Sequence, residues 1–321
     1  MKFPSRHGRQ GVALVVVLWA VALISTAMFG LATLLQRQLG QEVAALQNAR
    51  AILVAESGIQ MALNQGLSPA QTREAALQLS QLLQQGWQVP VRFEVLATGL
   101  VEEESKINLN ALLLGDREFA RRVLTNLFTQ WEVNATTSSR VIDAMLDWVD
   151  ADRLTTGNED ATEDYTQLPP GPQRGAGPRN APMESVDELS KVLGWDQLLQ
   201  EAGNPSWRNK FTVYGSGKLS LRFADQDVIE AWLDLPRGGA NAFLLARPGP
   251  DGVLGNEDDV VNPGLLGPSG GWDQRVSVAG GSDLWRVTST GTVGKVKRKV
   301  VALVSRNPPS VKARWVEADS P

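Results

Sequence analysis

A long uncharged apolar segment near the N-terminus constrains this 321-residue chain more than any other feature. It runs from Val12 to Leu35 and follows a short leader, residues 1–11, in which every charged residue is basic. At about 1.5 Å per residue, a helix of this length spans the roughly 30 Å hydrocarbon core of a bilayer. The basic leader predicts a cytoplasmic N-terminus, with the bulk of the chain on the other side. The segment is therefore predicted to be a single-pass membrane anchor.

The helical pattern continues beyond the apolar segment. From Gln36 to Gln65 apolar residues recur at helical spacing, and no proline interrupts them until Pro69. We expect one helix of about fifty residues whose outer half buries its apolar stripe against the globular part of the chain. An ordinary anchor followed by a solvated stalk is the alternative. A cleaved secretory signal peptide would have a shorter apolar region followed by a small-x-small site.

Two absences limit the chemistry that the chain can perform. It contains no cysteine, and its single histidine, His7, lies in the leader. A disulfide framework, a thiolate nucleophile and a cysteine zinc site are thereby excluded, and a chain without its leader lacks the commonest general base. The formal net charge of −4 provides no global positive field for nucleic acid. We expect no enzymatic activity, no organic cofactor and no nucleic-acid partner.

Strand patterns lie on both sides of the middle of the chain. Val89–Val101 is predicted to form a strand pair that turns near Gly99. Leu284–Ser289 and Lys297–Ser305 are predicted to form a hairpin that turns around Gly291–Gly294. With the long helix, these strands give an α+β fold in which the helix packs on an antiparallel sheet.

Residues 107–235 have a helical pattern instead and are predicted to form a large all-α domain inserted into the α+β domain. Ser185 with Glu188 three residues later is the capping box of one of its helices. A proline- and glycine-rich loop, residues 168–182, interrupts them. The predicted helices are Arg117–Trp131, Ser138–Trp148, Val186–Leu193, Trp195–Ala202 and Asp225–Asp234.

A basic leader, a glycine and an uncharged helix that starts at the next residue resemble the leader of type IV pilins. The resemblance implies that a prepilin peptidase cleaves between Gly11 and Val12 and that Val12 is then N-methylated. Most such subunits carry a glutamate at the fifth mature position, which is thought to contact the N-terminal amine of a neighbouring subunit. This chain has Val16 there, which suits a subunit at the end of a filament.

Further segments, in order and spacing, resemble the GspK family, the K minor pseudopilins of type II secretion systems. They are ARAILVAESGIQMAL (49–63), KINLNALLL (106–114), VIDAMLDWVDAD (141–152) and EDYTQLPPGPQRGAGPRNAPMESVDELSKVLGW (163–195). The resemblance implies a periplasmic subunit at the tip of a secretion filament, held in the inner membrane before assembly. Its implied partners are the I and J minor pseudopilins, with the G major pseudopilin beneath them. It also implies structural calcium near the helical module.

The expected organisation follows from these observations. Residues 1–11 are the leader and 12–35 the transmembrane half of the helix. Residues 36–106 and 236–306 are the two parts of the pilin-like α+β domain, the second with an acidic glycine-rich loop. Residues 107–235 are the insertion and 307–321 a C-terminal tail.

Two acidic loops are candidate calcium sites, because Ca²⁺ takes six to eight oxygen ligands in loose geometry. The alternative for both is a solvated, turn-rich surface loop, and neither matches the EF-hand spacing. In the second loop, glycines 252 and 255 would let the backbone close around an ion. The candidate ligands are Asp150, Asp152, Glu159 and Asp160 in the first loop and Asp251, Asn256, Asp258 and Asp259 in the second.

Three other features are weaker. The region from Ser185 to Leu199 faintly resembles a helix-hairpin-helix, so a DNA-handling membrane receptor of a competence or type IV pilus system is the alternative function. Its acidic residues would, however, repel phosphate. Paired carboxylates on loops do not provide the rigid placement that glycoside hydrolysis needs. The basic strand with Lys295, Lys297, Arg298 and Lys299 is interpreted as a charge-guarded edge, with an acidic neighbour or lipid as a minor alternative.

Overall fold

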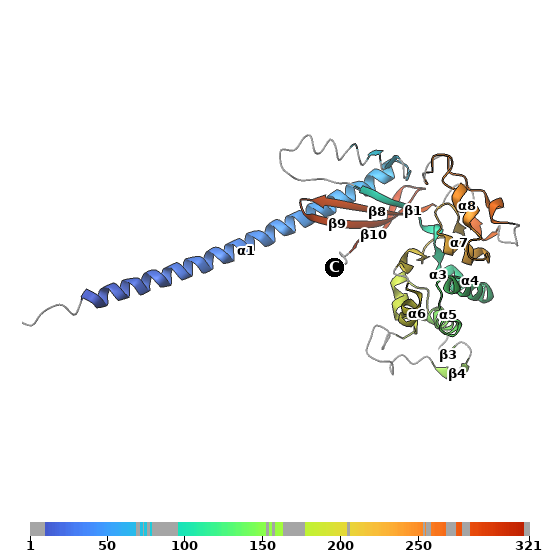
Figure 1. Cartoon of the computed structure of the whole chain (residues 1–321), viewed down its shortest axis with the longest axis horizontal. Helices are drawn as coiled ribbons and strands as arrows, with labels where there is room; N and C mark the ends of the chain where they lie inside the picture. Colours follow the sequence, from blue (N-terminus) through green and yellow to red (C-terminus); the bar gives the residue numbers. More distant parts are fainter. Residues whose placement is uncertain are drawn as a thin grey trace, which may run out of the picture.

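The computed structural model describes residues 10–68, 71–72, 74–75, 78, 96–151, 154–155, 158–162, 177–203, 206–252, 254, 258–267, 274–277 and 283–317. A long helix projects from a four-stranded sheet, and a helical module lies at the other end of that sheet (Figure 1). The expected α+β fold, with a long N-terminal helix on an antiparallel sheet and an added helical region, is confirmed.

Helix α1 spans Gln10–Asn64, so the apolar run and the amphipathic segment form one continuous helix, as predicted. Its apolar contacts with the sheet begin at Ala51 and follow a stripe that includes Ala55, Ile59 and Ala62. The expectation that the outer half buries its apolar stripe holds only from Ala51 onward, because Leu39 and other apolar residues before Ala51 stay exposed. The sheet does not reach them.

The sheet has four antiparallel strands in the order β1–β8–β9–β10. Alternate residues of β9, Val300, Ala302 and Val304, pack with Ala55 and Ile59 of α1 in a buried core, as the period of two requires. The strands are β1 (Leu96–Glu102), β8 (Leu284–Val293), β9 (Val296–Ser305) and β10 (Ser310–Glu317).

Helix and sheet approach each other very closely at Gly291 of β8. A Cβ atom there would lie 2.0 Å from the carbonyl oxygen of Ala51 and 2.6 Å from the backbone nitrogen of Ala55. Both atoms belong to the backbone of α1, so no change of side-chain rotamer would make room. The absence of a side chain at this position therefore allows α1 to contact the sheet.

The strand predictions were partly right. The β8–β9 hairpin is confirmed, with its turn at Gly294 and Lys295. The turn predicted near Gly99 is wrong, because Gly99 lies inside β1, which pairs with β8 and has an irregularity between Ala97 and Gly99. The other half of that predicted pair, Val89–Val95, lies outside the described residues. Residues 310–317, expected as tail, form β10.

After β1 the chain leaves the sheet and builds the helical module before it returns at β8. Helices α4, α5, α6 and α7 match the predicted helices closely. The predicted helix at Val186 is the 3₁₀ helix η2, and Ser185 and Glu188 form its capping box as predicted. The elements are η1 (Glu103–Ser105), β2 (Ile107–Asn108), α3 (Leu109–Leu113), α4 (Arg117–Gln130), α5 (Ala135–Val149), β3 (Leu154–Thr155), β4 (Asn158–Thr162), η2 (Val186–Lys191), α6 (Trp195–Ala202), η3 (Trp207–Asn209), β5 (Phe211–Thr212), β6 (Leu219–Ser220), α7 (Gln226–Leu233), α8 (Asn241–Ala246), η4 (Pro263–Leu266) and β7 (Val276–Ser277).

The module has its own apolar core, separate from the one beneath α1. Trp195 is fully buried there, with its ring 5.2 Å from that of Trp207 and 6.2 Å from that of Phe128. The same core includes Phe243 of α8 and Val276 of β7. The module therefore continues beyond residue 235, where the sequence pattern had suggested that it ends.

Candidate functional site

The exposed surface of α1 is the most distinctive feature of the molecule. Within the described ranges, α1 is the one helix long and apolar enough to cross a membrane. Its most apolar 18-residue stretch has a mean hydropathy of 2.4, and none of that stretch is buried. Phe29, for example, is 73% exposed. An apolar surface of this size requires lipid or another protein around it, so α1 fits a single-pass membrane anchor.

The residues of the predicted processing site lie at the start of this helix. The backbones of Gly11 and Val12 form part of its first turn. Val16 is 61% exposed, and the first acidic residue of α1 is Glu42. The apolar half of the helix therefore offers no carboxylate to a neighbouring amine.

A buried ion pair joins the sheet to the helical module. Glu103, in the 3₁₀ turn after β1, is fully buried, and Arg286 of β8 binds it with two hydrogen bonds, from Nε at 2.7 Å and from Nη2 at 2.6 Å. Thr212 of the module donates to the same carboxylate at 2.6 Å, and Lys106 lies 3.4 Å from it. The carboxylate thus bonds both parts of the molecule at once, and this fixes their relative position.

The neighbouring glutamates also reach into the module. The hydroxyl of Ser220 donates to Glu102, and the backbone nitrogen of Ser216 donates to Glu104 at 2.6 Å. Sequence reasoning missed this junction. The signal was three consecutive glutamates, residues 102–104, separated from KINLNA by Ser105 alone. Charged residues are rarely buried unless they are paired, so glutamates this close to a buried segment indicate partners.

Burial and pairing act in opposite directions on the charges at this junction. Burial alone would raise the pKa of Glu103, but the hydrogen bond from Arg286 and the charge of Lys106 hold that pKa below its usual value. Burial lowers the pKa of Lys106 to about 8, against the attraction of Glu103. Glu103 is therefore held ionised at neutral pH.

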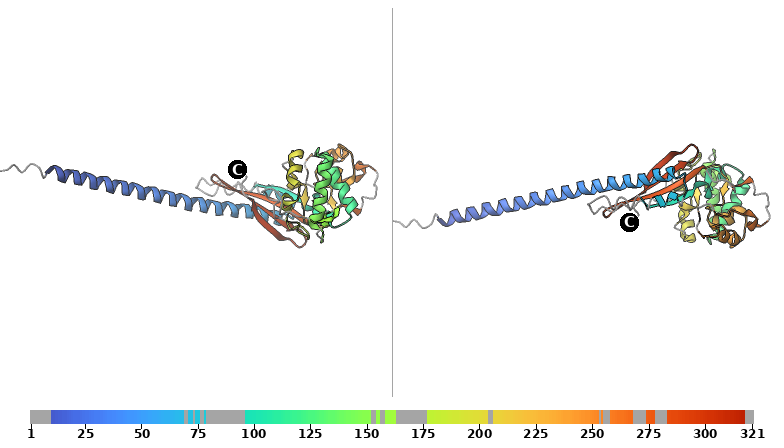
Figure 2. Two further views of the ribbon diagram at one scale, coloured as in Figure 1. Left: turned by 90° about the horizontal axis from the view of Figure 1, so that it is seen from below. Right: turned by 90° about the horizontal axis from the view of Figure 1, so that it is seen from above.

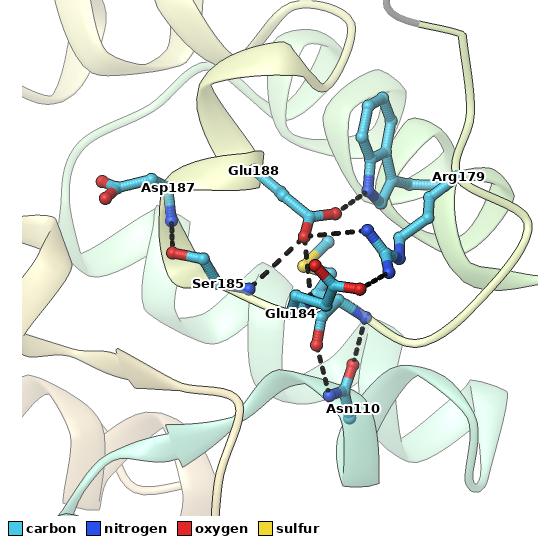
Figure 3. A network of polar contacts seen from close by, with 8 residues as sticks. Asn110, Arg179, Glu184, Ser185, Asp187 and Glu188 are labelled. Atoms are coloured by element: carbon cyan, nitrogen blue, oxygen red, sulfur yellow. Dashed lines mark hydrogen bonds and ion pairs between the residues drawn. The ribbon is translucent and has the colours of Figure 1, made fainter. Parts of the chain in front are cut away.

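A second polar network holds the segment before η2 (Figure 3). The side-chain amide of Asn110 accepts from the backbone nitrogen of Met183 at 2.8 Å and donates to its carbonyl at 2.9 Å. Glu188 accepts from Trp148 Nε1 at 3.1 Å and from the backbone nitrogen of Glu184 at 2.8 Å. This network links segments that the sequence resemblance had singled out, and it explains them as structural: they position η2 against α3 and α5.

Glu201 of α6 stabilises the start of α5. Its carboxylate accepts from Thr137 Oγ1 at 2.9 Å, from the backbone nitrogen of Asn134 at 3.1 Å and from Gln197 Nε2 at 3.0 Å. The hydrogen bond from Thr137, followed by that from Asn134, lowers the pKa of Glu201.

This lowered pKa gives a prediction for the pH dependence of stability. We expect Glu201→Gln to unfold at a lower temperature than the wild type at pH 7. The ionised carboxylate of Glu201 stabilises the folded chain fully at any pH above the pKa that Glu201 has in the unfolded chain. That stabilisation is lost as the pH falls through the lower folded pKa, so the two melting temperatures should converge in acid. Circular dichroism melts from pH 7 to pH 3 measure this. A constant difference over the range would contradict it, and Glu132→Gln, in an exposed ion pair with Arg237, is the control.

The first predicted calcium loop is only partly described. Asp150 accepts a hydrogen bond from Arg117 at 3.1 Å, so it is committed to an ion pair. Glu159 and Asp160 lie in β4, of which the structure describes the backbone, and Asp152 lies outside the described residues.

The second loop closes tightly on itself. A Cβ atom at Gly249 would lie 2.2 Å from the carbonyl oxygen of Asp258, and one carboxylate oxygen of Asp258 lies 3.4 Å from the backbone nitrogen of Asp251. Asp259 instead accepts from Arg222 Nε at 2.9 Å. Asn256 lies outside the described residues. The carboxylate of Asp259 is therefore paired with an arginine, while Asp251 and Asp258 lie close together.

The described side chains can be searched more widely for a metal site. Among the side chains that the structure describes, no group of three or more acidic or histidine residues is placed to hold a metal ion. Four of the eight candidate ligands, Asp152, Glu159, Asp160 and Asn256, have side chains outside that search, so the calcium site stays a prediction.

Comparison with known proteins agrees with the fold and with the segments of the helical module. The family described as "Type II secretion system (T2SS), protein K" matches residues 105–206, which include α3 to α6 and the network around Glu188. A sequence search of curated proteins finds no match.

Among solved structures, the chain is similar to a chain of the GspK–GspI–GspJ complex from the type 2 secretion system of enterotoxigenic Escherichia coli. The two are 20% identical with a TM-score of 0.57, and the match covers 88% of this chain and 100% of that one. The resemblance to the K minor pseudopilins is therefore confirmed: residues 105–206 match the protein K family of type II secretion systems, and the chain has the fold of a chain in the GspK–GspI–GspJ complex.

Proposed function

We propose that this chain is a minor pseudopilin that caps the tip of the type II secretion pseudopilus and, with other minor pseudopilins, starts filament assembly for protein export. The observation that carries the proposal is the placement of two different surfaces at opposite ends of one molecule. The free part of α1 projects from one end, and the bulky helical module lies at the other (Figure 2).

The mechanism is assembly rather than catalysis. Lipid covers the apolar half of α1 until the subunit leaves the membrane, and packing against other helices then replaces lipid. The ion pair of Glu103 with Arg286 holds the module firmly on the sheet, so the module blocks the addition of another subunit above it. The absence of a carboxylate at Val16 supports the same end position.

The proposal includes a place in the cell and a maturation step. The chain is held in the bacterial inner membrane with its N-terminus in the cytoplasm and its bulk in the periplasm. A prepilin peptidase cleaves between Gly11 and Val12, and the new N-terminus is methylated. The basic leader and the apolar helix support this orientation.

Its proposed partners are the I and J minor pseudopilins, with the G major pseudopilin beneath them. Support comes from the similar E. coli structure, which is a complex of GspK, GspI and GspJ.

A purification experiment tests the assembly role. We expect the full chain, solubilised in detergent, to co-purify with the I and J pseudopilins of its own secretion system on size-exclusion chromatography. Repeating it with a calcium chelator tests whether calcium, which we still propose as a structural ion bound through loop residues, supports the complex. If no complex forms in either condition, the tip assignment fails.

A DNA-binding receptor predicts a different result. We expect the full chain to show no DNA retention that weakens steeply with salt, because Glu184, Asp187 and Asp196 surround the region that resembles a helix-hairpin-helix. A filter-binding assay between 50 and 200 mM salt (on the order of the range over which phosphate contacts weaken) measures this. Strong, salt-sensitive retention would favour the receptor.

A further inference from the structure

The turn that joins β8 and β9 carries exposed positive charge and lies beside one particular turn of α1. Val293 and Val296 pack with Ala51 and Val54 of the helix, and a Cβ atom at Gly294 would lie 3.8 Å from Gln47 Nε2. The hairpin tip is therefore held against α1 near Gln47, at the end of the sheet nearer the free part of the helix (Figure 1).

Two lysines at this tip have no counter-charge in the part of the chain that the structure describes. Lys295 and Lys297 are exposed, and neither forms an ion pair with a described residue. Lys299, two residues further, lies beyond the tip and faces residue 317 of β10 in the sheet register. On α1, Glu42 lies about 140° around the helix from Gln47, on the other side from the hairpin, at 100° per residue.

An uncovered apolar surface of α1 begins directly below this tip. Leu39, Val43 and Leu46 are 60%, 54% and 53% exposed. At 100° per residue, Val43 lies about 40° around the helix from Gln47, Leu39 about 80° and Leu46 about 100°. Val43, one turn below Gln47, is therefore the nearest of the three to the hairpin tip, and Leu39 and Leu46 extend the apolar surface around the helix away from it.

We propose that Lys295, Lys297, Leu39, Val43 and Leu46 form one binding surface, the hairpin–helix surface, for a neighbouring subunit that presents apolar side chains bordered by carboxylates. This inference rests on the proposed function and adds the chemistry of one contact. The three apolar residues supply the area to be buried, and the two lysines select an acidic border.

The length of the helix favours a protein partner over lipid headgroups. Gln47 is twelve residues beyond Leu35, or about 18 Å along the axis. The headgroup layer adds only about 5–8 Å on each side of the hydrocarbon core. The remaining gap of about 10 Å exceeds the Debye length of about 8 Å at physiological salt. Headgroup attraction for the lysines is thus largely screened, and the apolar residues lie outside the hydrocarbon.

Charge reversal tests this surface. The full-length double variant K295E/K297E, in detergent, is titrated against immobilised I and J pseudopilins of the same system, and binding is followed by interferometry. We expect at least tenfold weaker binding, mainly through slower association, because exposed charges act on encounter and specificity. The neutral variant K295Q/K297Q should fall between it and the wild type.

The matched control is K191E/K218E, which makes the same change of charge at two exposed lysines of the helical module. A loss of binding confined to K295E/K297E supports the inference. Unchanged binding of K295E/K297E overturns the inference and leaves the proposed function intact, whereas failure of the wild type to bind I and J overturns the proposed function itself.

A final arm separates protein from lipid. The same titration is run in nanodiscs of phosphatidylcholine and of phosphatidylglycerol. We expect the weakened binding of K295E/K297E in both. A defect seen only with the anionic lipid would identify headgroups as the partner and overturn the inference.

Discussion

Replacing Arg286 by methionine is expected to lower the free energy of unfolding by about 3–5 kcal/mol, because it leaves the Glu103 carboxylate buried without its main partner. Thr212 and Lys106 remain near Glu103, but neither replaces the two hydrogen bonds of the guanidinium. Arg286 also lies over the ring of Trp315, 5.2 Å from its centroid, so its loss removes a second contact. Urea unfolding followed by tryptophan fluorescence measures the change.

The double variant E103L/R286M separates loss of the pair from exposure of a buried charge. Because a buried ion pair can often be replaced by apolar side chains at little cost, we expect the double variant to be more stable than R286M alone. Lys297→Met, on the exposed part of the same hairpin, should change stability by less than about 0.5 kcal/mol. If R286M were as stable as Lys297→Met, the junction would not depend on this ion pair.

Replacing Gly291 by valine is expected to cost about 3 kcal/mol or more, at the upper end of what overpacking usually costs. The new Cβ atom would lie 2.0 Å from the carbonyl oxygen of Ala51, so α1 must move away from β8. We expect the shared core of α1 and the sheet to open and limited proteolysis to cut the helix beyond Ala51. Urea unfolding and mass spectrometry of the fragments measure the two effects.

Gly40→Ala is the matched control on the helix, because nothing lies within 4 Å of a Cβ atom at Gly40. Alanine is the better helix former by about 1 kcal/mol, so this substitution should stabilise α1 slightly. Equal stability of G291V and the wild type would show that helix and sheet can separate without cost at this point.

Local patterns predicted the regular elements well. Continuous helical periodicity gave α1, and the capping box at Ser185 marked the start of η2. These signals depend on residues close together in the chain. The turn expected at Gly99 failed because the glycine there accompanies an irregularity in β1, a choice that depends on the distant partner strand β8.

The functional site was less predictable for the same reason. Glu103 is matched by Arg286, 183 residues away in the chain, and no local pattern identifies that pair. Asp259, predicted as a calcium ligand from its residue type in an acidic loop, also accepts a hydrogen bond from Arg222 in a different segment. When the role of a charged residue depends on a partner far away in the chain, a single sequence does not identify that role.

The pairing of Glu102 with Trp285 has a consequence for how such a molecule can change. The chain leaves the sheet just after Glu102 and returns just before Trp285. The paired strands β1 and β8 therefore already hold both ends of the inserted segment close together. The entropy of closing such a segment rises only slowly with its length, by about 0.6 kcal/mol for each doubling. The position therefore accepts a whole domain at little more cost than a long loop. Replacing the inserted segment by a tight turn would leave the pairing of β1 and β8 intact. The product would be the long helix packed on its four-stranded sheet, without the helical module.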